Sequence, residues 1–298
     1  MRGSWIARLA AVSAFALMPV VSGRAPAWGA ATSAPPQRVV SLNLCTDQLA
    51  VLLLPPDRIA ALSHLAADPT LSYVADRIGG IPLTQGGAEE LLALKPDLVL
   101  AGRYTARAAV RMAKAHHIPV VQVGLIADFD GIREQVRIVA AALGESATGE
   151  SLLADMDRRL AAAAPADGRR PTALSLAPGA FTSGAGTLTA AVMDAAGLAN
   201  YPAAKGMTGY GYLTVEGIVA DPPDLLITAA SETGTDRHPS LSGALIAHPA
   251  LLRAIPPGRR PRLEENLLGC GGPYTVEAVE ALAHARTEWL NRRETGTP

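Results

Sequence analysis

The feature that most constrains the fold is a local pattern that occurs twice in the chain. Residues 86–102 read GGAEELLALKPDLVLAG, and residues 213–229 read LTVEGIVADPPDLLITA. In each copy, Pro and Asp follow a glutamate seven and eight residues later, and a short apolar run comes next. Glu89, Pro96 and Asp97 correspond to Glu216, Pro223 and Asp224, each 127 positions further on (216 − 89, for example). The fixed spacing predicts two similar lobes that share a helix, a helix stop and a buried strand.

Strand-like and helix-like segments alternate through the first half of the chain, starting at Arg38. β-rich runs such as RVVSLNL and IPVVQVG are separated by helical stretches that end at Gly or just before Pro. In the first of these stretches, DQLAVLLL, Thr46 is placed to act as the N-cap. Alternation of this kind predicts a parallel sheet with helices on its faces.

A Leu- and Ala-rich stretch interrupts the alternation in the middle of the chain. It has no Pro or Gly between Glu150 and Ala164, so it predicts one long helix that joins two halves. The alternation restarts after Pro171 with the same order of elements. We therefore expect an α/β fold of two similar lobes with mostly parallel sheets, joined by one long rigid α-helix. The predicted divisions are a signal peptide at 1–30, an N-terminal lobe at 38–145, the bridging helix at 146–168 and a C-terminal lobe at 169–295.

The first 30 residues have the pattern of a secretory signal peptide. Arg2 and Arg8 precede an apolar stretch that is short for a membrane span, and small residues follow; an uncleaved anchor is the alternative. Removing these residues takes away three of the 26 basic residues and none of the 27 acidic ones, which leaves a net charge of 23 − 27 = −4. With no basic stripe, we expect no nucleic-acid partner. The prediction is an exported, periplasmic monomer.

Aromatic residues make up only 4% of the chain, so their positions are informative. In open parallel sheets, ligands bind beyond the carboxyl ends of the strands. Tyr104 and Phe181 directly follow predicted strands, while Tyr210, Tyr212 and Tyr274 lie in the Gly-rich segments GYGYL and GGPYT, which we expect to be loops. These five are candidates for stacking on a large planar or apolar ligand, although loop tyrosines can equally cover the edges of a core.

Polar and sulfur-containing residues are predicted at the same strand ends. Arg103 could pair with an anionic ligand or be a solvated surface residue, and His64 could contact a ligand or lie at the edge of the core. Cys45 and Cys270, the two cysteines of the chain, are expected at the cleft from opposite lobes. Export suggests a disulfide between them. The sequence cannot show that their Cα atoms lie within about 7 Å, and we prefer two free, partly buried thiols.

Neither a metal site nor a catalytic set is apparent. His116 and His117 precede a strand at its amino end, and His248, before Pro249, has the pattern of a local helix cap. The segment GAFTSGAGT has neither a nucleophile elbow nor a phosphate loop. We expect no catalytic residues, no metal ligands and no cofactor, and thus a protein that is not an enzyme.

The strand and helix segments quoted above, together with those given at the end of this paragraph, carry a family resemblance through their order. The chain resembles the substrate-binding proteins of bacterial ABC importers for vitamin B12, ferric siderophores and haem, the class III or helical-backbone type. The resemblance covers about Arg38 to Leu290. It implies two α/β lobes joined by a rigid helix, with small lobe motions and the ligand between the lobes. The segments that carry it are RVVSLNLCTDQLAVLL, GGAEELLALKPDLVLAG, HHIPVVQV, GTLTAAVMDAAGLAN, LTVEGIVADPPDLLITA, HPALLRAI and GGPYTVEAVEALA.

The resemblance also implies partners. In that family a glutamate on the outer rim of each lobe docks onto arginines of the membrane permease, and Glu89 and Glu216 occupy the matching positions. Acids in the first turn of a helix are also favoured by about 0.3–1 kcal/mol through the helix dipole alone. The implied function is a periplasmic receptor that binds an iron chelate, haem or cobalamin and delivers it to an ABC transporter permease dimer. The alternatives are a bare zinc or manganese receptor, and a sensor or adhesin module with the same fold.

Overall fold

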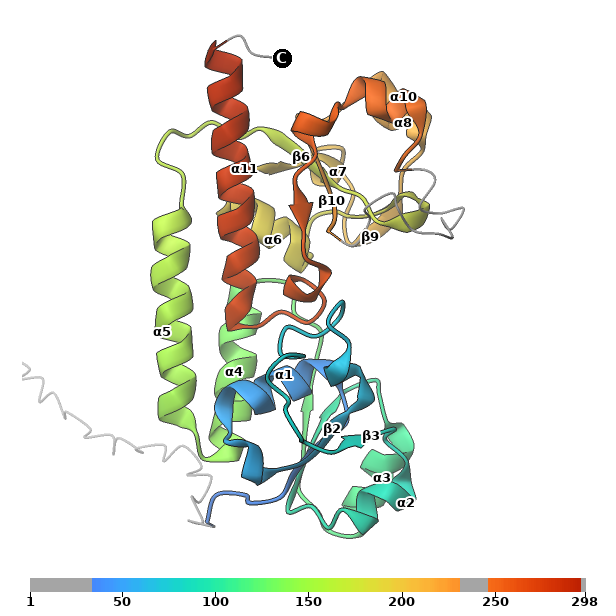
Figure 1. Ribbon diagram of the computed structural model, residues 1–298, viewed down its shortest axis with the longest axis vertical. Coiled ribbons are helices and arrows are strands. Elements are labelled where there is room, and N and C mark those ends of the chain that lie inside the picture. The colour runs from blue at the N-terminus through green and yellow to red at the C-terminus, as the bar shows by residue number, and fades with distance from the viewer. Residues whose placement is uncertain (1–33, 231–245, 296–298) are drawn as a thin grey trace, which may run out of the picture. The chain divides into compact units, whose positions relative to one another are not determined.

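The structure is a computed structural model and describes residues 34–230 and 246–295. The chain from Pro35 onward forms one compact unit, and the predicted signal peptide at 1–30 lies outside the described residues. Figure 1 shows the two sheets of this unit with the long helices α5 and α11 beside them.

The N-terminal half contains a five-stranded sheet in the order β3-β2-β1-β4-β5, with every neighbouring pair parallel. Its strands are short, and β1, β2 and β4 at its centre are largely buried because helices cover the sheet. The strands are β1 (Val39–Ser41), β2 (Ile59–Ser63), β3 (Leu83–Thr84), β4 (Leu98–Gly102) and β5 (Val120–Val123). The helices are α1 (Leu44–Leu53), α2 (Ala88–Ala93), α3 (Arg107–Ala115) and α4 (Phe129–Leu143).

The C-terminal half contains a four-stranded parallel sheet in the order β11-β10-β6-β8 and a separate antiparallel pair, β7-β9. The strands are β6 (Thr172–Ser175), β7 (Phe181–Ser183), β8 (Ala199–Asn200), β9 (Tyr210–Tyr212), β10 (Leu225–Ala229) and β11 (Arg262–Leu263). The helices are α6 (Leu188–Ala195), α7 (Tyr201–Ala204), α8 (Val215–Ala220), α10 (Pro249–Ala254) and α11 (Val276–Thr295). The predicted α/β class with mostly parallel sheets is confirmed.

The middle of the chain forms the single helix α5 (Ser146–Ala163), as expected, but the helix ends five residues before the predicted boundary. Ala164 leaves the helical region because Pro165 follows it. α5 packs along α11, and Arg159 of α5 donates to Glu280 of α11 at 2.8 and 2.7 Å. The predicted lobe divisions at 38–145 and 169–295 remain a proposal.

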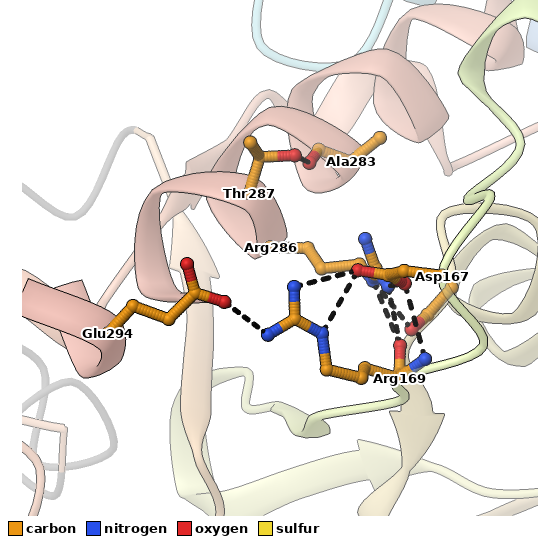
Figure 2. Close-up of polar contacts among 7 residues, drawn as sticks. Asp167, Arg169, Ala283, Arg286, Thr287 and Glu294 are labelled. Carbon is orange, nitrogen blue, oxygen red and sulfur yellow. Dashed lines mark hydrogen bonds and ion pairs between the residues drawn. The ribbon is translucent and has the colours of Figure 1, made fainter. Parts of the chain in front are cut away.

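The segment after α5 is fixed to α11 by a buried arginine (Figure 2). The guanidinium of Arg286 donates to the carbonyl oxygens of Arg169, at 2.6 and 3.1 Å, and Gly197, at 3.2 Å, and forms an ion pair with Asp167. Arg169 in turn donates to Glu294 at 2.6 Å. These contacts hold the connection between the two sheets against the C-terminal helix.

One hydrophobic core runs through both halves. It includes Val39 from the first sheet, Leu225 from the second, Met156 from α5 and Val279 from α11, all essentially buried. Because interiors are close-packed, a shared core opposes large rigid-body motion of one half against the other.

The repeated Pro-Asp has the same structural role in both halves. The carboxylate of Asp97 accepts hydrogen bonds from the backbone N–H groups of Gln37 and Arg38, at 2.6 and 3.0 Å, just before β1. The carboxylate of Asp224 accepts from the N–H and hydroxyl of Thr172 at the start of β6, both at 2.9 Å. Each aspartate therefore satisfies the backbone at the first strand of its half.

Local capping follows the sequence in two places and departs from it in one. Thr214 caps α8 by accepting from the N–H of Gly217. His248 caps α10 by accepting from the N–H of Ala250, as predicted. The N-cap of α1 is Asn43, which accepts from the N–H of Cys45 at 3.0 Å. Thr46 is buried in the first turn and shares a hydrogen bond with Ser41 instead, so its predicted capping role was wrong.

Candidate functional site

Three of the predicted ligand residues lie together on the antiparallel pair β7-β9. The ring of Phe181 stacks on that of Tyr210, with centroids 5.7 Å apart and planes 8° apart, and meets Tyr212 edge-on at 5.4 Å. Phe181 pairs with Tyr212 and Ser183 with Tyr210, so all three rings share one face of the pair. We call Phe181, Tyr210 and Tyr212 the aromatic group. The two tyrosines lie on a strand, not in a loop as the glycines of GYGYL suggested.

The aromatic group is directed outward because the other face of the strand is packed. Gly211 lies between the two tyrosines, and a Cβ there would lie 3.0 Å from the Cε of Met207. The backbone of Gly211 therefore packs directly against Met207. The side chains on the other face are exposed, Tyr210 at 61% and Tyr212 at 72%. The two exposed tyrosine rings, both in contact with Phe181, offer aromatic surface to a planar ligand.

The N-terminal sheet presents a smaller set at the carboxyl ends of β4 and β5. Tyr104 follows β4 and is 63% exposed, and Leu125 follows β5 and is 88% exposed. Arg103, which directly precedes Tyr104, is exposed at the same edge of the sheet. Its backbone N–H donates to the carbonyl oxygen of Val123 at 2.8 Å. Within residues 34–230 and 246–295, its guanidinium makes no ion pair, so its charge is open to an anionic group.

His64 begins a 3-10 turn at His64–Ala67, directly after β2, and is exposed. Its place at the carboxyl end of a strand is as predicted. The side chain makes no hydrogen bond or ion pair with the part of the chain that the structure describes.

The two cysteines form a disulfide, which corrects the preference for free thiols. Cys45 lies in the first turn of α1, and Cys270 lies in the segment before α11, 225 residues later, with 5.0 Å between the Cα atoms. The sequence could not show this proximity because it depends on how the C-terminal segment folds back onto the first helix. Cys45 therefore cannot offer a free thiolate to a ligand.

Tyr274 was expected on a Gly-rich loop, but it is buried with 4% of its surface exposed. Its ring stacks on Tyr73 at 4.2 Å, and burial, followed by the neighbouring Tyr73, raises the pKa of its hydroxyl. The hydroxyl of Tyr73 donates to Glu277 at 2.7 Å, and Asn266 donates to the carbonyl of Pro69 at 3.1 Å. Tyr274 is thus part of a seam, which includes the Cys45–Cys270 disulfide, between residues 45–73 and residues 266–277. This burial corrects its predicted place on a ligand surface.

A buried acid beside the disulfide was missed by the sequence analysis. Asp47 lies two residues after Cys45 on α1, and its carboxylate accepts from the N–H of Ser63 at 3.1 Å and from its hydroxyl at 2.5 Å. Burial is the main cause that raises the pKa of Asp47 to about 7, against the lowering effect of these hydrogen bonds. An acid in the first turn of a helix is ordinarily exposed, so no sequence pattern signals the burial of Asp47.

The two repeat glutamates occupy equivalent places. Glu89 is the second residue of α2, Glu216 is the second residue of α8, and both are exposed. Neither has an ion-pair or hydrogen-bond partner among the described residues. The adjacent Glu90 differs, because its carboxylate accepts from the N–H of Gln85 at 3.1 Å and its hydrogen bonds, that from Thr84 first, lower its pKa.

A model of the family described as periplasmic binding protein matches residues 39–260. The chain belongs to the periplasmic binding protein family. This confirms the resemblance drawn from the sequence.

Among relatives, a cobalamin-binding protein of Halobacterium salinarum is 30% identical over 259 residues, covering 84% of this chain and 69% of that protein. The apo structure of the periplasmic haem-binding protein RhuT of Roseiflexus sp. RS-1 is 25% identical, with a TM-score of 0.66 over 84% of this chain and 98% of that one. The vitamin B12 binding protein BtuF of Vibrio cholerae has the same fold, at 18% identity and a TM-score of 0.64 over 86% of this chain and 98% of that one. These relatives are named as binding proteins.

Within residues 34–230 and 246–295, no group of three His, Cys, Asp or Glu side chains is placed to hold a metal ion. In the same ranges, no helix combines the length and apolarity needed to span a bilayer.

Proposed function

We propose that the chain is an exported periplasmic receptor that binds an iron chelate, haem or cobalamin and delivers it to the permease of an ABC importer. The observation that carries the proposal is the aromatic group on one face of β7-β9, in which half-buried Phe181 stacks on Tyr210 and meets Tyr212 edge-on while both tyrosines are exposed, in a chain with few aromatics. Clustered exposed apolar side chains mark binding sites on soluble proteins. Membership of the periplasmic binding protein family supports the location and the class of function.

The proposed ligand contacts come from both halves. The aromatic group offers ring faces, Tyr104 and Leu125 add apolar surface, and Arg103 offers an unpaired positive charge to an anionic substituent. His64 stands at the carboxyl end of β2 as a further polar contact. These groups together suit a large, flat, partly anionic guest that is bound without chemical change.

Glu89 and Glu216 are proposed to dock on the permease. Both carboxylates are exposed and unpartnered in the described residues, and the fixed spacing of the repeat gives one to each half. Two separated charges steer association and fix orientation more than they add affinity. The shared core, the disulfide and the seam support small lobe motions during delivery.

Spectral titration with cobalamin, haem and several ferric siderophores tests ligand binding. We expect saturable binding of at least one, weakened by Tyr210→Ala and Tyr212→Ala. Tyr201→Phe, which changes a buried tyrosine away from the aromatic group, is the control for general damage. Absence of binding to every compound would contradict the proposal.

Uptake in cells tests docking separately. Glu89→Arg with Glu216→Arg should reduce transport to background while the purified protein binds ligand as before, because charge reversal repels the permease arginines that the family resemblance implies. Glu134→Arg, at another exposed glutamate on α4, should leave transport unchanged. Normal uptake by the double variant would exclude these two glutamates as docking residues.

A further inference from the structure

A cavity of about 530 Å³ lies between the last turns of α11 and the segment after α10, and we call it the α11 cavity. Its walls include Trp289, Arg292 and Arg293 of α11, with Pro256, Gly258 and Arg259 of the facing segment. It shares no residue with the aromatic group or with the other predicted ligand contacts. Its volume is within the range of small-molecule sites, about 300–1,000 Å³.

Arg259 is held in this wall by backbone carbonyl groups. Its Nε donates to the carbonyl oxygen of Asp224 at 2.7 Å, and its Nη2 donates to that of Pro223 at 2.5 Å. In the described ranges, 34–230 and 246–295, Arg259 forms no ion pair with an acid. The guanidinium is therefore fixed in position while its positive charge is left without a carboxylate.

Arg292 is fixed from the opposite side. Its Nη1 donates to the carbonyl oxygen of Gly258 at 2.8 Å, and its Nη2 donates to Glu288 at 3.1 Å. A Cβ on Gly258 would lie 2.7 Å from that Nη1, so a side chain at this position would displace the guanidinium. The glycine thus lets Arg292 lie close against the backbone at the cavity.

The acids near these arginines neutralise them only in part: Glu288 pairs with Arg292 at 3.1 Å, and Arg259 has no acid partner in residues 34–230 and 246–295. Asp224 lies at the wall, but its carboxylate accepts two hydrogen bonds from Thr172, and Arg293 reaches it at only 3.8 Å. Three guanidiniums thus meet two carboxylates, of which Glu288 pairs with Arg292 and Asp224 already has Thr172 as a partner, and Arg259 has no acid partner among the described residues. The electrostatic potential in the α11 cavity favours an anion.

The remaining wall is apolar and aromatic. Trp289 is half-buried, and the guanidinium of Arg293 lies 5.0 Å from the centre of its ring. Arg293 is 66% exposed at its side chain, so it can move away from the ring at little cost. Its departure would leave the indole and Pro256 open to a flat apolar group.

We propose that the α11 cavity binds a small aromatic carboxylate. The carboxylate lies between Arg259 and Arg292, where charge-assisted hydrogen bonds fix it, and the ring lies against Trp289. Fixed guanidiniums are suited to this because little side-chain entropy is lost when the anion binds. The inference is independent of the ligand proposed for the aromatic group.

The chain has three tryptophans, so the full chain carrying Trp5→Phe and Trp28→Phe reports on Trp289 alone. Benzoate should quench its fluorescence saturably, and calorimetry should give the same Kd. Benzamide, which has the same shape without the charge, should bind at least tenfold more weakly, because a hydrogen bond to a charged group contributes about 1.5–3 kcal/mol.

Arg259→Gln and Arg292→Gln should each raise the Kd for benzoate about tenfold or more. Arg253→Gln, at an exposed arginine of α10 outside the cavity, and Tyr210→Ala should change it less than twofold. If a glutamine variant does not fold, Arg292→Lys keeps the charge but loses the paired donors, and it should still weaken binding severalfold. Equal binding of benzamide, unchanged affinity in the Arg259 and Arg292 variants, or loss of binding in Tyr210→Ala would overturn the proposal.

Discussion

The N-terminal and C-terminal halves use the same contact to start their sheets and different contacts at the carboxyl ends of their strands. Asp97 and Asp224 satisfy the backbone before β1 and β6, and Glu89 and Glu216 occupy the same turn of equivalent helices. Beyond the strands the likeness stops. The first half has the buried Asp47, and the second adds β7-β9 with its aromatic group. Backbone groups must be satisfied in every copy, whereas residues beyond the strand ends are free to diverge and make an asymmetric site.

The largest effect is expected from cutting the link between the halves. Cys45→Ser with Cys270→Ser opens a loop of 225 residues, and the chain-entropy model gives a loss of about 5 kcal/mol in the free energy of unfolding. Denaturant unfolding measures the loss. A reductant should reproduce it in the unmodified protein and leave the double variant unaffected. A change below about 1 kcal/mol would mean that the core and the seam hold the halves together without the disulfide.

Asp47 should give the first half a pH dependence that the second half does not share. Burial raises its pKa from 3.8 to about 7, so between these values the folded state keeps a proton that the unfolded state has lost. Stability should therefore fall as pH rises through this window, by up to about 4 kcal/mol, with no further loss from this group above it. Asp47→Asn, which resembles the protonated form, should be more stable than the unmodified protein at pH 8.

Thermal unfolding from pH 4 to pH 8 checks this expectation. Asp76→Asn is the control, because Asp76 is an acid of the same half whose side chain is 82% exposed, and its profile should follow that of the unmodified protein. A profile in which Asp47→Asn loses stability with pH as steeply as the unmodified protein would show that Asp47 is not the titrating group.

The scaffold was predictable from the sequence because its signals are local. The repeat, the glycine and proline stops and the strand-helix alternation gave the two parallel sheets and α5. The two-residue strands β3 and β8 were missed, because so short a run has no period of its own. The ring contacts of Tyr210 and Tyr212 with Phe181 were also missed, because glycine normally marks a loop. Gly211 lies in a strand because its backbone packs closely on Met207.

The site was predicted in part for a similar reason. Residues placed directly after strands, such as Tyr104 and Arg103, lie where the rule for parallel sheets puts them. Tyr274, Cys45 and Asp47 depend on contacts with segments up to 225 residues away, which no local pattern encodes. Their positions are set by the return of the C-terminal segment onto α1 and by the packing of α1 on β2.

Replacing Asp97 or Asp224 should lower the free energy of unfolding moderately, and by different amounts. Asp97→Ala removes acceptors from two exposed backbone N–H groups that water can then satisfy, so we expect a loss of about 1 kcal/mol. Asp224→Ala removes acceptors from Thr172, which is partly buried, and we expect about 2 kcal/mol. Urea unfolding measures both losses, and the reverse order would contradict burial of the backbone partner as the reason for the difference.

The smallest expected effect is on ligand affinity, and it should differ between variants of the two halves. For whichever compound the spectral titration selects, Tyr210→Ala should raise the Kd about threefold to tenfold, because it removes a ring that is stacked on Phe181 before binding. Tyr104→Ala should have the smaller effect, since no aromatic ring among the described residues contacts Tyr104 and its ordering on binding offsets part of its contact energy. Equal increases in Kd for the two variants would mean that both halves contribute equally to ligand affinity. The sequence differences beyond the strands would then not determine how the ligand binds.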